Sequence, residues 1–233
     1  MRWRLGIACG LVLGMAAFLD AAPGEPVHSR APAASPACAP FPFVDEGPRR
    51  PDFVAFRNWL LDAVARRDVD AVVGIAVPDI ALSFGAIDAS GRDVLRAQLA
   101  DKDHHRWDGL RDLLLLGGTF GSPDDFTAPY VYAKWDYSRD AFEEQAIVAS
   151  GVRLRAAPRA DAPVIGSLSY CIVSVPSSKQ PHDEAWNTWR AVTLDGDHLA
   201  FVASRYLRRA NDLRAGFQFK DGRWHMTFFI GGD

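Results

Sequence analysis

The stretch from Ala149 to Leu207 constrains the fold of this chain more than any other part of its sequence. It opens with Ala-Ser-Gly-Val-Arg-Leu-Arg-Ala-Ala-Pro and continues with Val-Ile-Gly-Ser-Leu. A Trp-x-x-Val segment follows at 189–192, then Asp-Gly at 195–196, and Phe-Val-Ala-Ser-Arg-Tyr-Leu closes the stretch. Several short motifs therefore follow one another in a defined order over about a quarter of the chain.

The order of these motifs resembles that of the bacterial SH3-like (SH3b) domain. Such domains open with a strand of the type Leu-Asn-Val-Arg, followed by a small residue and a proline, here Pro158. They continue through a Val-Ile-Gly-x-Leu strand and end on Trp-Val-x-x-x-Tyr-Leu, where Phe201 stands in place of the tryptophan. The resemblance implies a small β-barrel over 146–210 that binds a cell-wall peptide or an envelope protein, and it implies no reaction.

A β-hairpin is predicted after the barrel, because Asp221-Gly222 separates two alternating runs. This ending resembles that of small α+β cone folds of the nuclear-transport-factor-2-like kind, and 53–85 resembles the start of such folds. The resemblance implies an α+β domain that begins at 52–145 and is closed by the hairpin at 211–233, with the SH3-like barrel as an insertion. The alternative is an α+β domain of no named family. An isolated hairpin is marginal in water, so its aromatic side chains need a partner face in either case.

The segment before the barrel alternates between helix and strand patterns. Apolar residues at helical spacing predict a helix that follows Asp52 as its N-cap. A second helix is predicted over 69–77, capped by Asp68 and ended by Pro78, and alternation over 80–84 predicts a strand.

Two further helices and a strand are predicted before residue 145. Ser90-x-x-Asp93 is a capping-box-like start for a helix through Ala100. A stripe of large apolar residues predicts another helix, which Gly117-Gly118 ends; the stripe consists of Trp107, Leu110, Leu113 and Leu114. Aromatic and β-branched residues predict a strand over 126–135, and Pro129 places it at an edge.

Residues 1–22 have the pattern of a secretory signal peptide. Arg2 and Arg4 precede an apolar run over 6–19, which is shorter than the ~20 residues of a membrane-spanning helix. Small residues follow at Ala21 and Ala22, so we expect cleavage, export to the periplasm or the outside of a bacterial cell, and no membrane span in the mature chain. The alternative is a retained anchor.

The segment 23–51 is expected to be a Pro/Ala-rich extended linker. Between Ala21 and Pro51 lie eight of the fifteen prolines, which remove backbone donors and disfavour helix. Phe41 and Phe43, on either side of Pro42, are expected to mark where this segment touches the folded body.

Composition and charge exclude one class of partner. With 48% hydrophobic and 24% charged residues, the chain is ordinary for a soluble globular protein. Its formal net charge is −3, and removal of the signal takes away two arginines and one aspartate. No basic surplus exists to neutralise phosphates, so nucleic acid is not expected as a partner.

The cysteines predict a disulfide between Cys38 and Cys171. Of the three cysteines, Cys9 leaves with the signal, and the remaining even pair in an oxidising compartment favours a bond. Cys38 is not expected to carry a lipid, because 35–37 lacks the leucine-like residue of that motif.

No catalytic residue, cofactor or metal is expected. Phosphate-binding loops, dinucleotide fingerprints, zinc-protease helices and nucleophile elbows are absent from the sequence. Bacterial SH3-like domains often accompany cysteine peptidases, but Cys171 lies at a strand start within the barrel pattern, which favours a disulfide or an inert thiol. Adjacent helix residues point about 100° apart, so His104 and His105 do not converge on one ion. Asp101 and Asp103 would add mixed ligands, but charges before a helix favour a solvated cap.

The first domain offers polar residues for the alternative cone fold. Asp79, Ser83, Asp88 and Tyr130 would line its cavity, where buried acids abstract protons. Their spacing is also that of ordinary caps and turns, so it does not separate the two interpretations.

The candidate ligand-binding residues lie in the barrel. Arg153 and Arg155 alternate with apolar residues and make one strand face basic. Trp186 lies in a polar loop and Tyr206 near the end of the barrel, and exposed aromatics there suit a peptide or glycan groove. The alternative for Tyr206 is a plug at the barrel end. Two other large aromatics are expected in the barrel core, Trp189 and Phe201.

These patterns together predict an exported, non-enzymatic binding protein of the periplasm or cell envelope. The alternative function is a small-molecule-binding or enzymatic cone-like α+β domain with an accessory barrel. A third is a secreted effector or inhibitor whose barrel meets a partner protein. A deep polar cavity in the first domain would favour the cone, and an aromatic groove on the barrel would favour binding.

Overall fold

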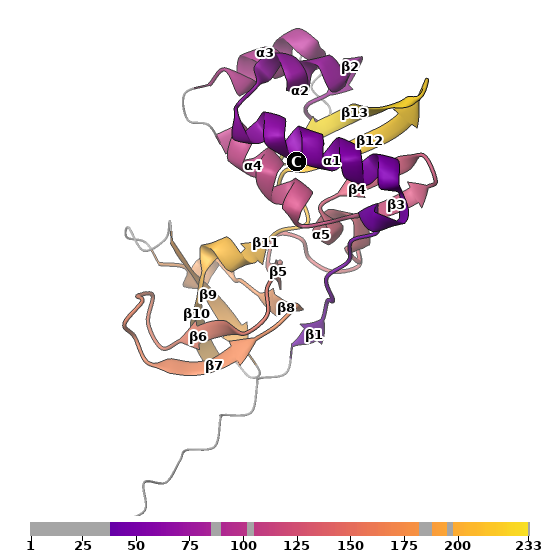
Figure 1. Cartoon of the computed structure of the whole chain (residues 1–233). Coiled ribbons are helices and arrows are strands. Elements are labelled where there is room, and N and C mark those ends of the chain that lie inside the picture. The colour runs from indigo at the N-terminus through magenta and orange to yellow at the C-terminus, as the bar shows by residue number, and fades with distance from the viewer. Residues whose placement is uncertain (1–37, 85–89, 102–104, 182–187, 195–197, 233) are drawn as a thin grey trace, which may run out of the picture. The chain divides into compact units, whose positions relative to one another are not determined.

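The computed structural model describes residues 38–84, 90–101, 105–181, 188–194 and 198–232 (Figure 1). These residues form two β-sheets together with several helices, which confirms the predicted α+β class. The five α-helices of the described residues are α1 (Pro51–Ala65), α2 (Val69–Ile75), α3 (Arg92–Leu99), α4 (His105–Leu115) and α5 (Tyr130–Lys134).

A five-stranded sheet joins segments that lie far apart in the sequence. Its members are β2 (Ala76–Ala81), β3 (Thr119–Ser122), β4 (Asp125–Ala128), β12 (Arg214–Lys220) and β13 (Arg223–Ile230). The order is β2-β13-β12-β4-β3, with β2 and β13 parallel and the other pairs antiparallel. The two C-terminal strands therefore lie inside the sheet, between strands that come from residues 76–128.

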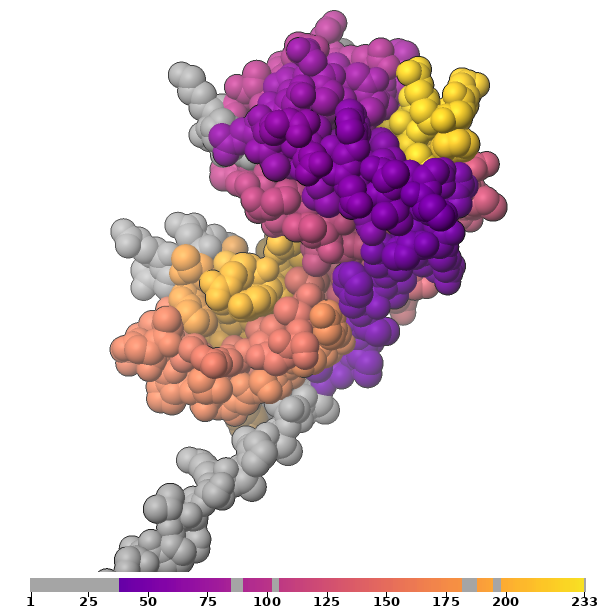
Figure 2. Space-filling view, viewed as in Figure 1, coloured from indigo at the N-terminus to yellow at the C-terminus, as the bar shows by residue number. Residues whose placement is uncertain are grey.

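The β12–β13 hairpin turns through Asp221 and Gly222, whose φ angles are +52° and +77°. Positive φ at both central residues is what a type I′ turn requires, and Asp-Gly supplies it at little steric cost. Helix α1 lies beside this hairpin (Figures 1 and 2), and the ring of Phe53 lies 4.8 Å from that of Trp224.

The core of this part is apolar and rich in aromatic rings. The Phe53 ring, from α1, lies 4.1 Å from that of Phe126 in β4. The stripe predicted for α4 is buried in the same cluster, as is Phe217 of β12. Helices α1 and α4 cover one face of the sheet (Figure 1) because the amphipathic stripe of each must be buried against it.

A second, eight-stranded sheet is formed by the middle of the chain. Its strands are β1 (Ala39–Pro40), β5 (Glu144–Ile147), β6 (Val152–Arg155), β7 (Val164–Leu168), β8 (Cys171–Ser174), β9 (Trp189–Leu194), β10 (His198–Ala203) and β11 (Leu207–Arg208). The order is β11-β5-β8-β9-β10-β6-β7, and β1 pairs with β8 beside this path. A short 3-10 helix, Ser204–Tyr206, connects β10 to β11. The buried apolar side chains of this sheet, which include Leu154 and Val202, form a separate core cluster.

The disulfide predicted between Cys38 and Cys171 is confirmed, with the two sulfurs 2.08 Å apart. The prediction of an extended linker over 23–51 is wrong for the described part of that segment, which is packed against the rest of the protein. Residues 39–40 pair with β8, and Phe41 stacks on Tyr130 with ring centres 5.4 Å apart. Phe43 also contacts Tyr130, at 5.3 Å, so both phenylalanines mark the predicted point of contact.

Several element boundaries differ from the prediction. The N-cap of α1 is Arg50 rather than Asp52, because Pro51 takes the first helical position, where its missing N–H costs nothing. Asp68 does cap α2, accepting from the backbone N–H of Ala71 at 3.0 Å. The helix ends at Ile75, so that β2 already contains Pro78.

Two other expectations fail among the elements around the five-stranded sheet. The cap of α3 is Gly91, and Ser90 instead forms a bridge with Ala81. The strand expected over 126–135 stops at Ala128, and helix α5 follows Pro129. Proline cannot donate to a ladder, which explains the end of the strand. Strand β4 also lies between β12 and β3 rather than at the edge.

Among the described residues, no helix is both long and apolar enough to cross a membrane.

Candidate ligand-binding site

The basic face expected on β6 points away from the core. Val152 and Leu154 enter the apolar cluster of the eight-stranded sheet, whereas Arg153 is exposed and Arg155 is half-buried. A strand alternates its side chains between two faces, so both arginines share the outer face.

The neighbouring strands add an aromatic wall to that face. β10 pairs with β9, where Ala203 lies opposite Trp189. The expectation that Trp189 and Phe201 fill the core is wrong, because both are half-buried and absent from the core cluster. In β10 the small residues Ala200 and Val202 face inward, which turns Phe201 outward by the two-residue period of a strand.

The 3-10 helix Ser204–Tyr206 brings Arg205 and Tyr206 to the same place. The guanidinium carbon of Arg205 lies 4.7 Å from the centre of the Tyr206 ring, a cation–π distance. Its Nη2 donates to the Tyr206 hydroxyl at 3.2 Å. The Tyr206 ring also packs against the core cluster, so it serves both as a core contact and as a wall of the surface hollow.

These side chains surround a hollow of about 370 Å³. It is lined by Ser150, Gly151, Val152, Arg153, Arg155, Ala160, Trp189, Ala203, Arg205 and Tyr206. Its volume lies within the range of ~300–1,000 Å³ typical of small-ligand sites. Three of the four candidate ligand residues named from the sequence, Arg153, Arg155 and Tyr206, thus meet around one hollow. The fourth, Trp186, lies outside the described residues.

The hollow is positively charged. Within the described part of the chain, no carboxylate lies within 4.0 Å of the guanidinium of Arg153, Arg155 or Arg205. Arg155 is held in place by its Nη1, which donates to the carbonyl of Ala162 at 2.6 Å. Guanidinium groups of this kind bind carboxylates through two parallel hydrogen bonds. The arrangement therefore suits a ligand that carries an acidic group beside an apolar or planar part.

Two charged or aromatic lining residues, Arg205 and Trp189, are not among the site residues predicted from the sequence. Arg205 follows Ser204 in the closing motif, and only the 3-10 turn shows that its guanidinium folds back over Tyr206. Trp189 was placed in the core because a small barrel needs large side chains. The signal that would have found it is the alternation of β9, in which Val192 faces inward.

The described residues predicted to line a cone cavity lie in different surroundings. Tyr130 is fully buried against Phe41 and Phe43, and burial raises its pKa to about 12. Asp79 is exposed, and Ser83 donates to the carbonyl of Phe84 at 3.4 Å. Asp88 lies outside the described residues.

The disulfide occupies the sulfur of the candidate cysteine. Cys171 is bonded to Cys38, so it cannot act as a nucleophile. In the part of the chain that the structure describes, which excludes Asp103 and His104, no group of three His, Cys, Asp or Glu side chains could hold a metal ion.

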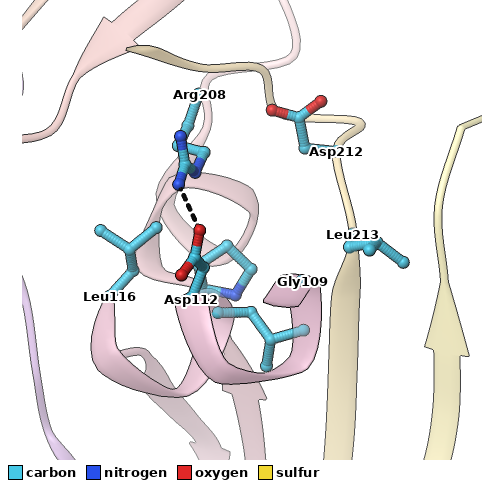
Figure 3. A pocket seen from close by; sticks show the side chains of 8 residues that line it. Gly109, Asp112, Leu116, Arg208, Asp212 and Leu213 are labelled. Atoms are coloured by element: carbon cyan, nitrogen blue, oxygen red, sulfur yellow. Dashed lines mark hydrogen bonds and ion pairs between the residues drawn. The ribbon is translucent and has the colours of Figure 1, made fainter. Parts of the chain in front are cut away.

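A smaller hollow of about 260 Å³ lies between α4 and the segment after β11 (Figure 3). Arg208 donates to Asp112 across it at 2.8 Å, so these two charges pair with each other rather than with a ligand. Leu213 fills the space above Gly109, where a Cβ atom would come 2.1 Å from its Cδ1. This hollow is below the usual size of a ligand site, and we assign it a packing role.

Comparison of the chain with protein-family models, with curated proteins and with solved structures gave no match.

Proposed function

We propose that this chain is an exported binding protein of the bacterial periplasm or envelope, and that it catalyses no reaction. An SH3-like barrel over 146–210 recognises an acidic peptide of the cell wall through the arginine-lined hollow. The barrel is an insertion in an α+β domain, which the hairpin at 211–233 closes.

The observation that carries the binding proposal is the convergence of three arginines and two aromatic rings on one hollow. Arg153, Arg155 and Arg205 supply donors for carboxylates, and Trp189 and Tyr206 supply flat apolar surface. Buried aromatic and arginine side chains are the groups that most often dominate binding energy. A peptide that carries free carboxylates fits this combination, whereas a polyanion the size of a nucleic acid would meet a chain of net charge −3.

Two features support the insertion, and a third supports the SH3-like barrel. Residues 144–208 supply the eight-stranded sheet except for β1. Residues 214–230 return to pair with β4 and β2. The 3-10 turn at Ser204–Tyr206 lies in the closing motif on which the SH3-like resemblance rests.

The test is retention on purified, insoluble peptidoglycan, with solubilised envelope extract in parallel. The wild type should sediment with peptidoglycan, and Arg153→Ala combined with Arg205→Ala should abolish most of that retention at an unchanged melting temperature. Arg159→Ala is the matched control, because Arg159 lies outside the hollow and pairs with Asp161 at 2.8 Å.

Wild-type protein that stays in the supernatant would overturn the wall-peptide proposal. Retention that the double variant keeps would remove the hollow as the site. Capture of one envelope protein, lost in the same double variant, would replace the wall peptide by that partner.

A further inference from the structure

A second surface of the molecule exposes aromatic rings that the proposed function does not use. Phe84, Tyr137 and Phe142 are 55%, 66% and 62% exposed, which makes them three of the four most exposed large hydrophobic residues in the described part of the chain. All three line one hollow of about 650 Å³. Exposed aromatic side chains gathered in one place commonly mark an interaction site.

Buried contacts hold two of the rings around this hollow in place. Arg214 is 2% exposed, and its guanidinium carbon lies 4.7 Å from the centre of Phe84 and 5.0 Å from that of Tyr132. Its Nη1 donates to the carbonyl of Asn211 at 2.9 Å, which fixes the guanidinium. The ring of Tyr137 stands edge-on to Tyr132 at 6.4 Å and 82°. The rings of Phe84, Tyr132 and Tyr137 therefore have neighbours that hold them in position before a ligand binds.

A carboxylate at the rim is pre-organised as well. Asp140 Oδ1 accepts from the backbone N–H of Phe142 at 2.8 Å and of Glu143 at 3.2 Å. No described residue donates to Asp140 Oδ2, so this oxygen can accept from a ligand. Arg139, also in the lining, donates to Glu144 at 2.7 Å, which neutralises its charge locally.

The charges around the hollow select for a neutral ligand. A cation would approach the Arg214 guanidinium, which already occupies the faces of Phe84 and Tyr132. An anion would meet the Asp140 carboxylate at the rim. A purely apolar ligand would leave Asp140 desolvated without a partner. The class of ligand that remains is neutral and carries both hydroxyl donors and a flat face of C–H groups.

We propose that this hollow binds an oligosaccharide. The apolar faces of pyranose rings stack on Tyr137 and Phe142, and sugar hydroxyls donate to Asp140 Oδ2. This site is separate from the arginine-lined hollow and does not depend on the function proposed for it, because the two share no residue.

The test is titration of the isotope-labelled full chain with soluble hexasaccharides of β-1,4-linked glucose, β-1,4-linked N-acetylglucosamine and α-1,4-linked glucose, followed by NMR. At least one should shift resonances of residues 137–142. Tyr137→Ala and Phe142→Ala should each weaken that binding by about tenfold or more. Asp140→Asn, which keeps an acceptor oxygen, should weaken it less than Asp140→Ala does.

Two control variants test whether the loss of oligosaccharide binding is specific to this hollow. Leu115→Ala removes an equally exposed apolar side chain, 60% exposed, on α4 and should leave binding unchanged. Arg153→Ala with Arg205→Ala should also leave it unchanged, whatever becomes of peptide binding. The proposal is overturned if no hexasaccharide shifts these resonances, or if the aromatic variants bind as well as the wild type. It is also overturned if choline chloride shifts them instead, because choline is a cation that binds aromatic faces.

Discussion

Asp52 shows how a single side chain joins two segments that lie far apart in the sequence. Its carboxylate accepts from Arg50 at 2.9 and 2.7 Å and from the indole N–H of Trp224 at 3.1 Å. The Arg50 guanidinium in turn lies over the rings of Phe219 and Trp224 at 5.1 and 5.3 Å. The start of α1 is thereby connected to the C-terminal hairpin.

This contact predicts acid sensitivity. The hydrogen bond from Arg50 is the largest cause that lowers the pKa of Asp52 from 3.8 to about 2. Because the folded pKa lies below the unfolded one, the stabilisation is present above about pH 4 and is lost as the pH falls towards 2. The Asp52 side chain is 42% exposed, so solvent screening limits the effect to about 1 kcal/mol or less.

Urea unfolding of the wild type and Asp52→Asn at pH 7 and pH 2 measures the stabilisation that the ionised Asp52 carboxylate contributes. The wild type should be the more stable of the two at pH 7, and the difference should disappear near pH 2. A difference of equal size at both pH values would show that the ionised carboxylate plays no part.

At the scale of elements, the β12–β13 hairpin contributes several aromatic side chains to the core against the five-stranded sheet. Trp224 is 4% exposed, and its ring contacts Phe53 at 4.8 Å and Phe219 at 5.4 Å. Large-to-small changes at such positions leave a cavity as well as losing transfer free energy. We expect Trp224→Ala to lower the free energy of unfolding by about 3–5 kcal/mol.

Chemical denaturation gives the value, and Lys220→Ala, an exposed position on the same hairpin, is the control. A loss below about 1 kcal/mol for Trp224→Ala would mean that the hairpin is only loosely attached.

The Cys38–Cys171 bond is a second prediction at this scale, because it ties β1 to β8 across a sequence separation of 133 residues. Closing so long a loop in the unfolded chain corresponds to about 4–5 kcal/mol as an upper value. Cys38→Ser with Cys171→Ser should therefore melt well below the wild type, and reductant should lower only the wild-type melting temperature. Alkylation of the unreduced, denatured wild type should label neither cysteine; two labels on protein from an oxidising compartment would contradict the bond.

Elements with a regular pattern were predictable from the sequence, and those set by tertiary contacts were not. The stripe of α4, the Asp68 cap and the alternation of β6 each depend on neighbours along the chain, and the structure shows all three. Helix α5 was missed because its aromatic residues are typical of strands, whereas their burial against the N-terminal segment determines their conformation. The packing of 38–50 was hidden by its prolines, since the disulfide and β1 hold that segment in place.

At the scale of the whole molecule, the position of β12 and β13 between β2 and β4 makes the five-stranded sheet depend on residues 214–230. A fragment of 52–145 lacks the two central strands of its sheet, so we expect no cooperative thermal melt from it. A fragment of 143–210 contains all strands of the other sheet except β1 and should melt cooperatively. Circular dichroism decides both points, and a cooperative melt of 52–145 alone would contradict the insertion.

The candidate site was predictable in part. Arg153, Arg155 and Tyr206 were named from a strand period and a closing motif, which are local features. Their convergence with Trp189 and Arg205 depends on strand order and on the 3-10 turn, which the sequence does not display.

Binding of acidic peptides by the arginine-lined hollow can be measured by calorimetric titration with a soluble, carboxylate-bearing cell-wall peptide. We expect saturable binding that weakens with salt and falls by about thirtyfold, or ~2 kcal/mol, in Arg153→Ala combined with Arg205→Ala. Arg159→Ala should bind like the wild type. Equal affinity of the double variant and the wild type, or no binding of an acidic peptide by either, would show that the hollow is not an acidic-peptide site.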